Sequence, residues 1–390
     1  MKTSKMTIQK RLCKGIMIMT ALALFACNPV QNAPINNPQS TNLEKVRIAL
    51  MVPQSNASTA DLANSLKNAA RLAVEDLSGA NIELQVYDTA GNDSTAETLT
   101  AQAIEAGADI ILGPLFGNVA NKVGLVAAQT GTNVLSFSNN SSIAGGNVYL
   151  LGQTFDDSAK RIVKFAADQG KQRAVIAYPK SVEGEFAKFA LERAAAETSL
   201  EIVSTQGFDL SREAVANTVP LIKAAVDLED ADLVLLTSTT AGALGLLVQM
   251  LPEVGVKPDL IQYAGLARWD VPVQNLDLPG VQGGWFPVPD QTLINDFSAR
   301  YEARFESKPH DLASLAYDGV AAIGALALSG QPDALSAQSL QQPAGFEGVN
   351  GIFRFKEDGT NERGLAIAQI VNKQVEIIDP APQSFDYSGY

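Results

Sequence analysis

Residues 109–140 read DIILGPLFGNVANKVGLVAAQTGTNVLSFSNN, and this stretch decides the predicted fold. A short apolar run ends abruptly at Gly113 and Pro114, as expected of a strand that is buried on both faces of a parallel sheet. Apolar residues at helical spacing follow Asn118, a residue type that often caps helices, and Gly131 ends them. A second apolar run starts at Val134. The order of strand, helix and strand predicts a βαβ unit.

Candidate ligand contacts follow each strand of this unit. Phe116 and Asn118 come after the first strand, and Ser136 and Ser138 come after the second. Open α/β sheets bind ligands at the carboxyl ends of their strands, where backbone N–H groups and helix N-termini converge. The alternative interpretation, ordinary turns that hold no ligand, stays open at this point.

The same alternation extends in both directions along the chain. β-branched strands and alanine-rich helices predict an α/β protein with doubly wound sheets. The alternation restarts near residue 155, so we expect two lobes, each with its own sheet. A glycine-rich connecting strand is expected at 280–285, and a turn at 357–360 predicts a hairpin between 351–355 and 364–371. The expected boundaries are 45–154 with 286–342 for the first lobe, 155–285 with 343–379 for the second, and 380–390 for a tail.

The N-terminus has the features of a secretion signal. Residues 1–26 begin with five basic residues and no acidic one, and an apolar segment of 12 residues follows, too short to span a bilayer. The segment ends in LFAC, which resembles the lipobox of bacterial lipoproteins; this resemblance implies cleavage before Cys27 and lipidation of its side chain. Asn28 rather than Asp at the next position implies sorting to the outer membrane. Residues 27–44 then form the lipidated cysteine and an uncharged, flexible tether.

Composition excludes several classes of partner. The chain is 46% hydrophobic and 18% charged, as a globular protein is. Without the five basic residues of the signal, 24 Lys and Arg face 42 Asp and Glu, a net charge of −18. This negative charge argues against nucleic acid as a partner and against electrostatic binding to anionic lipid. The expected membrane contact is therefore the lipid anchor alone. Cys27 is the one cysteine that the mature chain would keep, so we expect no disulfide.

Catalysis has little support in the sequence. His310 is the only histidine, and the chain has no HExxH, CxxC or P-loop motif. His310 is expected to open the helix that follows it, and Asp156 and Asp157 are expected to serve a helix N-terminus. We therefore expect a protein that is not an enzyme, with no cofactor and no metal ion.

The order of elements resembles a known family. Segments such as VRIALMVP, ADIILGPLFGNVA, VLSFSNN, DQGKQRAVIAYP and GVNGIFRFKEDGTNERGLAIAQI together resemble the type I periplasmic binding fold over about residues 45–378. The resemblance implies two Rossmann-like lobes that are joined by three crossover strands and hold a ligand in the cleft between them. Within this fold, the lipobox, ILGPLFGNVA and DQGKQRAVIAYP look most like the lipoprotein activators of class A penicillin-binding proteins.

The branched-chain amino-acid receptors of ABC transporters share this fold and are the main competitor. They usually carry a small hydroxyl residue in the first loop, where this chain has the bulky Phe116, and often a tyrosine where it has Val182. Ser136 and Ser138 remain in the second loop, so only part of a zwitterion site is present. The expected cleft candidates are Gln54, Ser55, Phe116, Asn118, Ser136, Ser138, Tyr178, Glu183, Arg268, Trp269 and Trp285.

Two of these expectations have an alternative. Tyr178, Trp269 and Trp285 stand where a cleft wall is expected, but packing between or within the lobes would also explain them. Arg268 could hold an anion or could pair with Asp270.

The sequence therefore predicts a lipoprotein at the periplasmic face of the outer membrane. The resemblance implies that it activates a class A penicillin-binding protein in peptidoglycan synthesis without catalysis of its own. The alternative is a solute-binding receptor for an ABC permease that imports amino acids or a similar small molecule, and a sensor for a small ligand is a third possibility.

Overall fold

The structure is a computed structural model, and it describes residues 45–385. The signal, Cys27 and the tether lie outside the described residues. Within the described part, no helix has both the length and the apolar character needed to cross a membrane.

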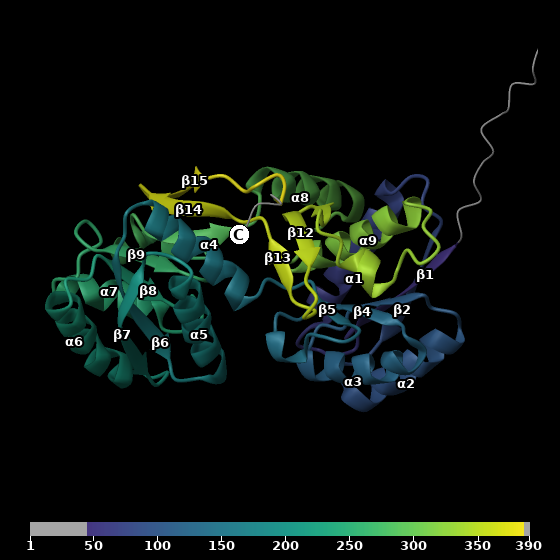
Figure 1. Ribbon diagram of the computed structural model, residues 1–390, viewed down its shortest axis with the longest axis horizontal. Helices are drawn as coiled ribbons and strands as arrows, with labels where there is room; N and C mark the ends of the chain where they lie inside the picture. Colours follow the sequence, from purple (N-terminus) through teal and green to yellow (C-terminus); the bar gives the residue numbers. More distant parts are fainter. Residues whose placement is uncertain (1–44, 386–390) are drawn as a thin grey trace, which may run out of the picture. The chain divides into compact units, whose positions relative to one another are not determined.

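The first sheet has five parallel strands in the order β2-β1-β3-β4-β5. Its strands are β1 (Val46–Val52), β2 (Ile82–Asp88), β3 (Ile110–Leu112), β4 (Asn133–Ser136) and β5 (Val148–Leu150). The helices of this lobe are α1 (Ala60–Asp76), α2 (Asp93–Glu105), α3 (Gly117–Ala127), α8 (Gln291–Phe305), α9 (Ala313–Leu328) and α10 (Ala337–Leu340). Figure 1 shows α1 and α9 on one side of this sheet and α2 and α3 on the other. The predicted βαβ unit is confirmed as β3, α3 and β4.

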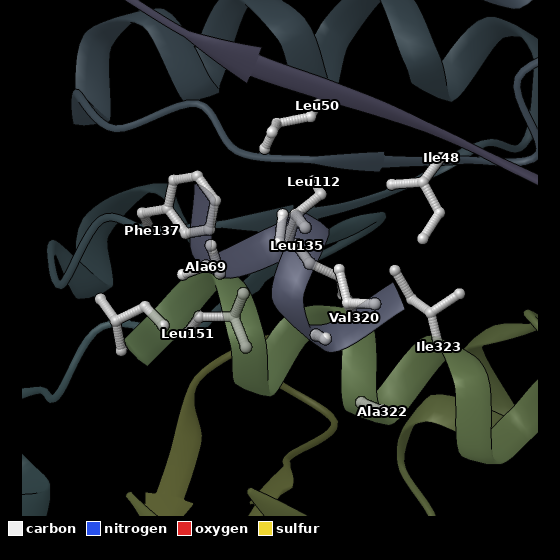
Figure 2. Packing of buried hydrophobic residues seen from close by; sticks show 14 of the residues in the cluster. Ile48, Leu50, Ala69, Leu112, Leu135, Phe137, Leu151, Val320, Ala322 and Ile323 are labelled. Carbon is white, nitrogen blue, oxygen red and sulfur yellow. The ribbon is translucent and has the colours of Figure 1, made fainter. Parts of the chain in front are cut away.

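Both faces of this sheet are covered by helices. Successive side chains of a strand point to opposite faces, so each strand contributes residues to two cores. On β1, Ile48 and Leu50 join a core with α1 and α9, where Ala69, Val320 and Ile323 meet them (Figure 2). Ala49 and Met51 join the opposite core, which contains buried residues of α2 and α3. Continuous apolar strands are the sequence signature of a sheet that is buried in this way.

The second sheet has seven strands in the order β15-β14-β10-β9-β8-β6-β7. Five are parallel to one another, β14 is antiparallel to β10, and β15 is antiparallel to β14. The strands are β6 (Arg173–Pro179), β7 (Glu201–Phe208), β8 (Leu233–Leu236), β9 (Gln262–Gly265), β10 (Trp285–Val288), β14 (Ala366–Val371) and β15 (Gln374–Asp379). The helices are α4 (Phe155–Asp168), α5 (Val182–Ala196), α6 (Arg212–Leu228) and α7 (Leu244–Glu253).

A small third sheet contains β11 (Phe346–Gly348), β12 (Gly351–Phe355) and β13 (Asn361–Arg363), all antiparallel. The turn at 357–360 therefore joins β12 to β13. The predicted pairing of 351–355 with 364–371 is wrong. After Arg363 the chain passes into the seven-stranded sheet as β14. Gly364 and Leu365 form this link.

The chain passes between the two large sheets three times: after β5, after β10 and after β13. The predicted fold class, two doubly wound lobes joined by crossovers, is thus confirmed.

Two of the predicted lobe boundaries differ from those in the structure. Residues 286–288 belong to the second sheet, because β10 pairs with β9 and β14, so the connection comes after the strand and not at 280–285. Residues 346–355 belong with the first lobe, because Phe346, Phe353 and Phe355 are buried in its core.

Candidate functional site

The carboxyl ends of β3 and β4 are tied to each other. Gly113 has φ +94°, and a Cβ there would collide with the carbonyl oxygen of Met51, so the turn after β3 requires glycine. The Ser136 hydroxyl donates to the Pro114 carbonyl (3.0 Å) and accepts from the Ser138 N–H (3.1 Å). Ser136 is fully buried. The hydrogen bonds of this hydroxyl thus connect the two loops to each other.

The other first-lobe candidates lie in loops that also bind one another. Asn118 donates to the Asp93 carboxylate (2.6 Å), Gln54 donates to Asn64 (3.2 Å), and the Ser55 N–H donates to Asp88 (3.1 Å). A Cβ on Gly91 would lie 3.0 Å from the Phe116 ring and 3.1 Å from the Asn56 side chain. The structure therefore brings together the loops after β1, β2 and β3, with the half-buried Phe116 among them.

Ser138 lies beside the N-terminus of α3. A Cβ on Gly117 would lie 3.3 Å from the Ser138 hydroxyl oxygen, and that oxygen accepts from the Asn140 N–H (3.1 Å). Ser138 is 7% exposed. Ser136 and Ser138 thus lie close together, and both hydroxyls have partners inside the first lobe.

In the second lobe, the end of β8 carries two hydroxyls that sequence reasoning missed. Thr237 and Ser238 are 5% and 3% exposed, and neither side-chain oxygen has a hydrogen-bond partner among the described residues. Buried polar groups are nearly always hydrogen-bonded, and these two hydroxyls are adjacent members of a set of seven such side-chain atoms without a partner in the described part of the chain. The sequence signal was available, because TSTT follows the apolar strand LVLL just as SFSNN follows NVL in the first lobe.

Arg268 pairs with Asp270, as one of the two sequence interpretations predicted. Its Nε donates to the Asp270 carboxylate at 2.6 Å. Desolvation by burial acts to lower the pKa of Arg268, but the hydrogen bond to Asp270 and the charges of Asp270 and Asp311 together raise it above its ordinary value. Asp311 precedes α9 of the first lobe, so this arginine interacts with charges from both lobes.

Tyr178 and Glu183 lie at the end of β6 and the start of α5. The half-buried Tyr178 packs beside Gly207, where a Cβ would lie 2.9 Å from the phenol oxygen, and the Lys188 ammonium lies 5.2 Å from its ring centroid. Desolvation, together with the charge of Glu185, raises the pKa of Tyr178. Glu183 is exposed in the first turn of α5.

The expectation that Trp269 and Trp285 line a cleft is wrong. Trp269 is fully buried and stacks on Phe286 at a centroid distance of 6.2 Å. Its indole lies against Gly265 and Gly284, at both of which a Cβ would collide with the ring. Trp285 is 8% exposed and contacts Phe165 edge to face at 5.0 Å. Each ring belongs to a core of the second lobe, and the two glycines leave space for the indole of Trp269.

A buried polar cluster lies at the connections between the lobes, and sequence reasoning missed it. The Asp318 carboxylate of α9 pairs with the Arg363 guanidinium of β13 (2.9 Å) and accepts from the Val349 N–H (2.7 Å) and the Asn350 amide (2.8 Å). Arg363 also donates to the Leu151 carbonyl, at 2.6 and 3.1 Å. These bonds tie the first and third connections to a first-lobe helix.

Asn361 and Asp157 complete this cluster. The Asn361 amide donates to the carbonyls of Leu150 (2.8 Å) and Gly152 (2.9 Å). Asp157, in the first turn of α4, accepts from the Arg363 N–H (3.0 Å), while its Oδ2 has no hydrogen-bond partner among the described residues. Desolvation raises the pKa of Asp157 to about 7, against the opposing effects of the Arg363 N–H and guanidinium. The Asp156 side chain, by contrast, pairs with Arg193 on the surface.

A cavity of about 590 Å³ runs beside this cluster along α4. The cationic side chains that line it have acidic partners: Lys160 with Glu197, Arg161 with Asp379, Lys164 with Asp168, and Arg363 with Asp318. Such a neutralised lining does not select an anion. Between residues 45 and 385, no group of three or more His, Cys, Asp or Glu side chains could hold a metal ion.

Two doubly wound lobes, three connections and polar loops at the strand ends define a binding protein of the periplasmic type. The model of the periplasmic binding protein family matches residues 45–374, and the chain belongs to this family. Residues 45–374 include every strand of both large sheets except β15, of which only Gln374 is matched.

Several solved structures of similar fold are named for ABC transport. One from Rhodospirillum rubrum, assigned to branched-chain amino acid ABC transport, has a TM-score of 0.73 and 16% identity over 86% of this chain and 100% of the other. A substrate-binding protein from Desulfitobacterium hafniense, in complex with Leu, has a TM-score of 0.63 and 18% identity over 86% of this chain and 100% of the other. At these identities the likeness concerns the fold alone.

A curated relative of the chain is named for a different role. The penicillin-binding protein activator LpoA of Shigella flexneri serotype X (strain 2002017) is 30% identical over 104 residues, which is 26% of this chain and 15% of the relative. The chain thus matches less than a fifth of the length of that relative.

Proposed function

We propose that this protein is a non-catalytic activator of a class A penicillin-binding protein in peptidoglycan synthesis. The observation that carries the proposal is the likeness to a curated penicillin-binding protein activator, at 30% identity over 104 residues. The geometry of the strand ends supports it. Ser136, Ser138 and Trp269, three of the groups expected to hold a solute, are engaged in internal contacts. An activator acts through its outer surface and does not need a complete solute site.

Purified full-length lipoprotein and a purified class A synthase from the same organism test this function. We expect the protein to bind the synthase and to increase its rate of glycan polymerisation or cross-linking from lipid II. A branched-chain amino-acid receptor of the same fold serves as the control and should leave the rate unchanged. Absence of both binding and stimulation would overturn the proposal.

The second candidate is a solute receptor for an ABC importer or a small-ligand sensor. The unpartnered hydroxyls of Thr237 and Ser238 favour it, because a bound solute would supply their missing hydrogen bonds. Mass spectrometry of the protein, purified without denaturation and then unfolded, would reveal a retained small molecule. Such a molecule, lost from a Thr237→Val/Ser238→Ala variant that keeps its stability, would put this candidate first.

Location at the periplasmic face of the outer membrane, through lipid on Cys27, is part of the proposal. The lipobox resemblance of LFAC supports it, together with membership of the periplasmic binding protein family. Metabolic labelling with a fatty-acid analogue tests the anchor: the wild type should carry label and Cys27→Ser should not. Label retained by the variant would contradict the lipid assignment.

A further inference from the structure

The outer face of α5 carries an exposed apolar stripe. Val182, Phe186 and Phe189 are 68%, 44% and 45% exposed. Their spacing of four and then three residues places them on one face of the helix, where neighbouring side chains of successive turns meet. Two exposed phenylalanines in one stripe are uncommon on a surface that faces only water, and large aromatic side chains dominate the energetics of protein interfaces.

Acidic side chains flank this stripe on both sides. At 100° per residue, Glu183 lies on one flank of the stripe, and Glu185 and Glu192 lie on the other. Glu185 pairs with Lys188 at 3.0 Å, and the Lys188 ammonium also lies 4.1 Å from the Phe189 ring centroid. Among residues 45–385, neither Glu183 nor Glu192 forms a salt bridge, although the charge of Glu192 helps to raise the pKa of the neighbouring Lys188. The exposed Arg193, one turn beyond Phe189, pairs with Asp156, so the flanks of the stripe keep a net negative charge.

A shallow hollow of about 380 Å³ lies at the C-terminal end of α5. Glu192, Ala196 and Ile202 are among its lining residues. Ile202 belongs to β7, the last strand of the seven-stranded sheet, so the hollow opens at the edge of the sheet. An apolar stripe and a hollow lined by a carboxylate on the same helix can receive an apolar face and a basic side chain of one partner.

We propose that the outer face of α5 is the docking surface for the protein partner, and that the partner presents an apolar segment flanked by lysine or arginine. The inference rests on the proposed function, whose partner is a class A synthase. Apolar side chains of the partner pack on Phe186 and Phe189, and its basic side chains approach Glu183 and Glu192. Charge complementarity selects this occupant over a second copy of the chain, because two copies would bring like charges together.

Two variants with a matched control test the docking surface. Phe186→Ser/Phe189→Ser removes the aromatic contacts, and Glu183→Lys/Glu192→Lys reverses the flanking charges. The control, Leu221→Ser/Leu228→Ser, removes two leucines that are 55% and 81% exposed on α6 of the same lobe. Binding of each full-length protein to the purified synthase is measured by biolayer interferometry at two salt concentrations, with circular dichroism melting as the test of folding.

We expect each α5 variant to bind the synthase about tenfold or more weakly, as for loss of interface anchors, while the control binds as the wild type does. Wild-type binding should also weaken as salt rises. Binding by the wild type that both α5 variants retain would overturn the docking surface and leave the proposed function intact. Failure of the wild type to bind would overturn both. A wild-type dimer in sedimentation that Phe186→Ser/Phe189→Ser converts to a monomer would assign the stripe to self-association instead.

Discussion

The Asp318 carboxylate and the Arg363 guanidinium form a salt bridge of 2.9 Å in which the side chains are 0% and 3% exposed. Asp318 lies on α9 of the first lobe, and Arg363 ends β13, directly before the chain crosses into the second sheet. Both residues have further hydrogen-bond partners, so the pair is a fully bonded unit at the connection between the lobes.

Removal of one partner of this pair should strongly destabilise the fold. Asp318→Ala leaves the guanidinium of Arg363 buried without its counter-charge, and we expect a loss of about 3–5 kcal/mol in the free energy of unfolding. Urea denaturation measures it. The matched control is Asp168→Ala, which breaks the exposed pair with Lys164 (3.2 Å) and should cost less than about 1 kcal/mol. Equal losses in the two variants would contradict the assignment of a structural role to the buried pair.

Asp157 should make stability depend on pH between about 4 and 7. Desolvation raises its folded-state pKa to about 7, from an unfolded-state value of 3.8. The folded state therefore binds the proton more tightly, and the stability that this proton contributes is present in full below pH 4 and is lost as the pH rises to 7. Asp157→Asn abolishes this titration. Relative to wild type, the variant should gain roughly 2 kcal/mol between pH 5 and pH 8.

Urea denaturation of wild type and Asp157→Asn at several pH values between 5 and 8 measures this difference. Titration of other groups cancels when the two curves are subtracted, since Asp157 alone differs. A difference that stays constant across the range would show that Asp157 does not titrate there.

Trp269 should be essential to the second-lobe core. Because the ring is fully buried and stacked on Phe286, Trp269→Ala leaves a large cavity and should cost about 3–5 kcal/mol of unfolding free energy. Chemical denaturation followed by circular dichroism measures the loss, and the exposed Leu228→Ala on α6 is the control. Unchanged stability, with loss of a small molecule that copurifies with the wild type, would instead indicate a ligand-stacking role.

Branched-chain amino acids should not bind. Phe116 occupies the first loop, and the Ser136 hydroxyl donates to Pro114, so the donors that a zwitterion requires are incomplete. Leucine, isoleucine or valine at millimolar concentration should therefore leave the melting temperature unchanged. A ligand at 100 times its Kd adds about 2.7 kcal/mol, which scanning fluorimetry detects as a shift of several degrees. Such a shift with any of the three would place the transport receptor first.

The periodicity of the sequence was sufficient to predict the two doubly wound lobes. Strands such as β1 and β3 are short apolar runs, and their partners follow from the local order of strand and helix. The boundaries at β10 and β11 escaped prediction because strand pairing decides them. Residues 286–288, which were expected in the first lobe, pair with β14 of the second sheet, and the local sequence carries no signal of this pairing.

The buried cluster at the connections could not be predicted from local sequence. Asp157 and Arg363 are 206 residues apart, and Arg363 and Asp318 are 45 apart. In the sequence, Asp157 has the features of an ordinary residue at a helix N-terminus, and nothing near it indicates burial. The sequence pattern predicted that Ser136 and Ser138 follow a strand end. The partners of their hydroxyls depend on loop geometry that only the structure shows.

The burial of both indoles in one lobe determines what optical measurements on this protein report. Trp269 and Trp285 are the only tryptophans of the chain, and both belong to second-lobe cores. Indole fluorescence therefore reports unfolding of the second lobe and does not report unfolding of the first. Emission and far-ultraviolet dichroism coincide only when the two lobes unfold as one cooperative unit, which makes the pair of signals a direct measure of their coupling.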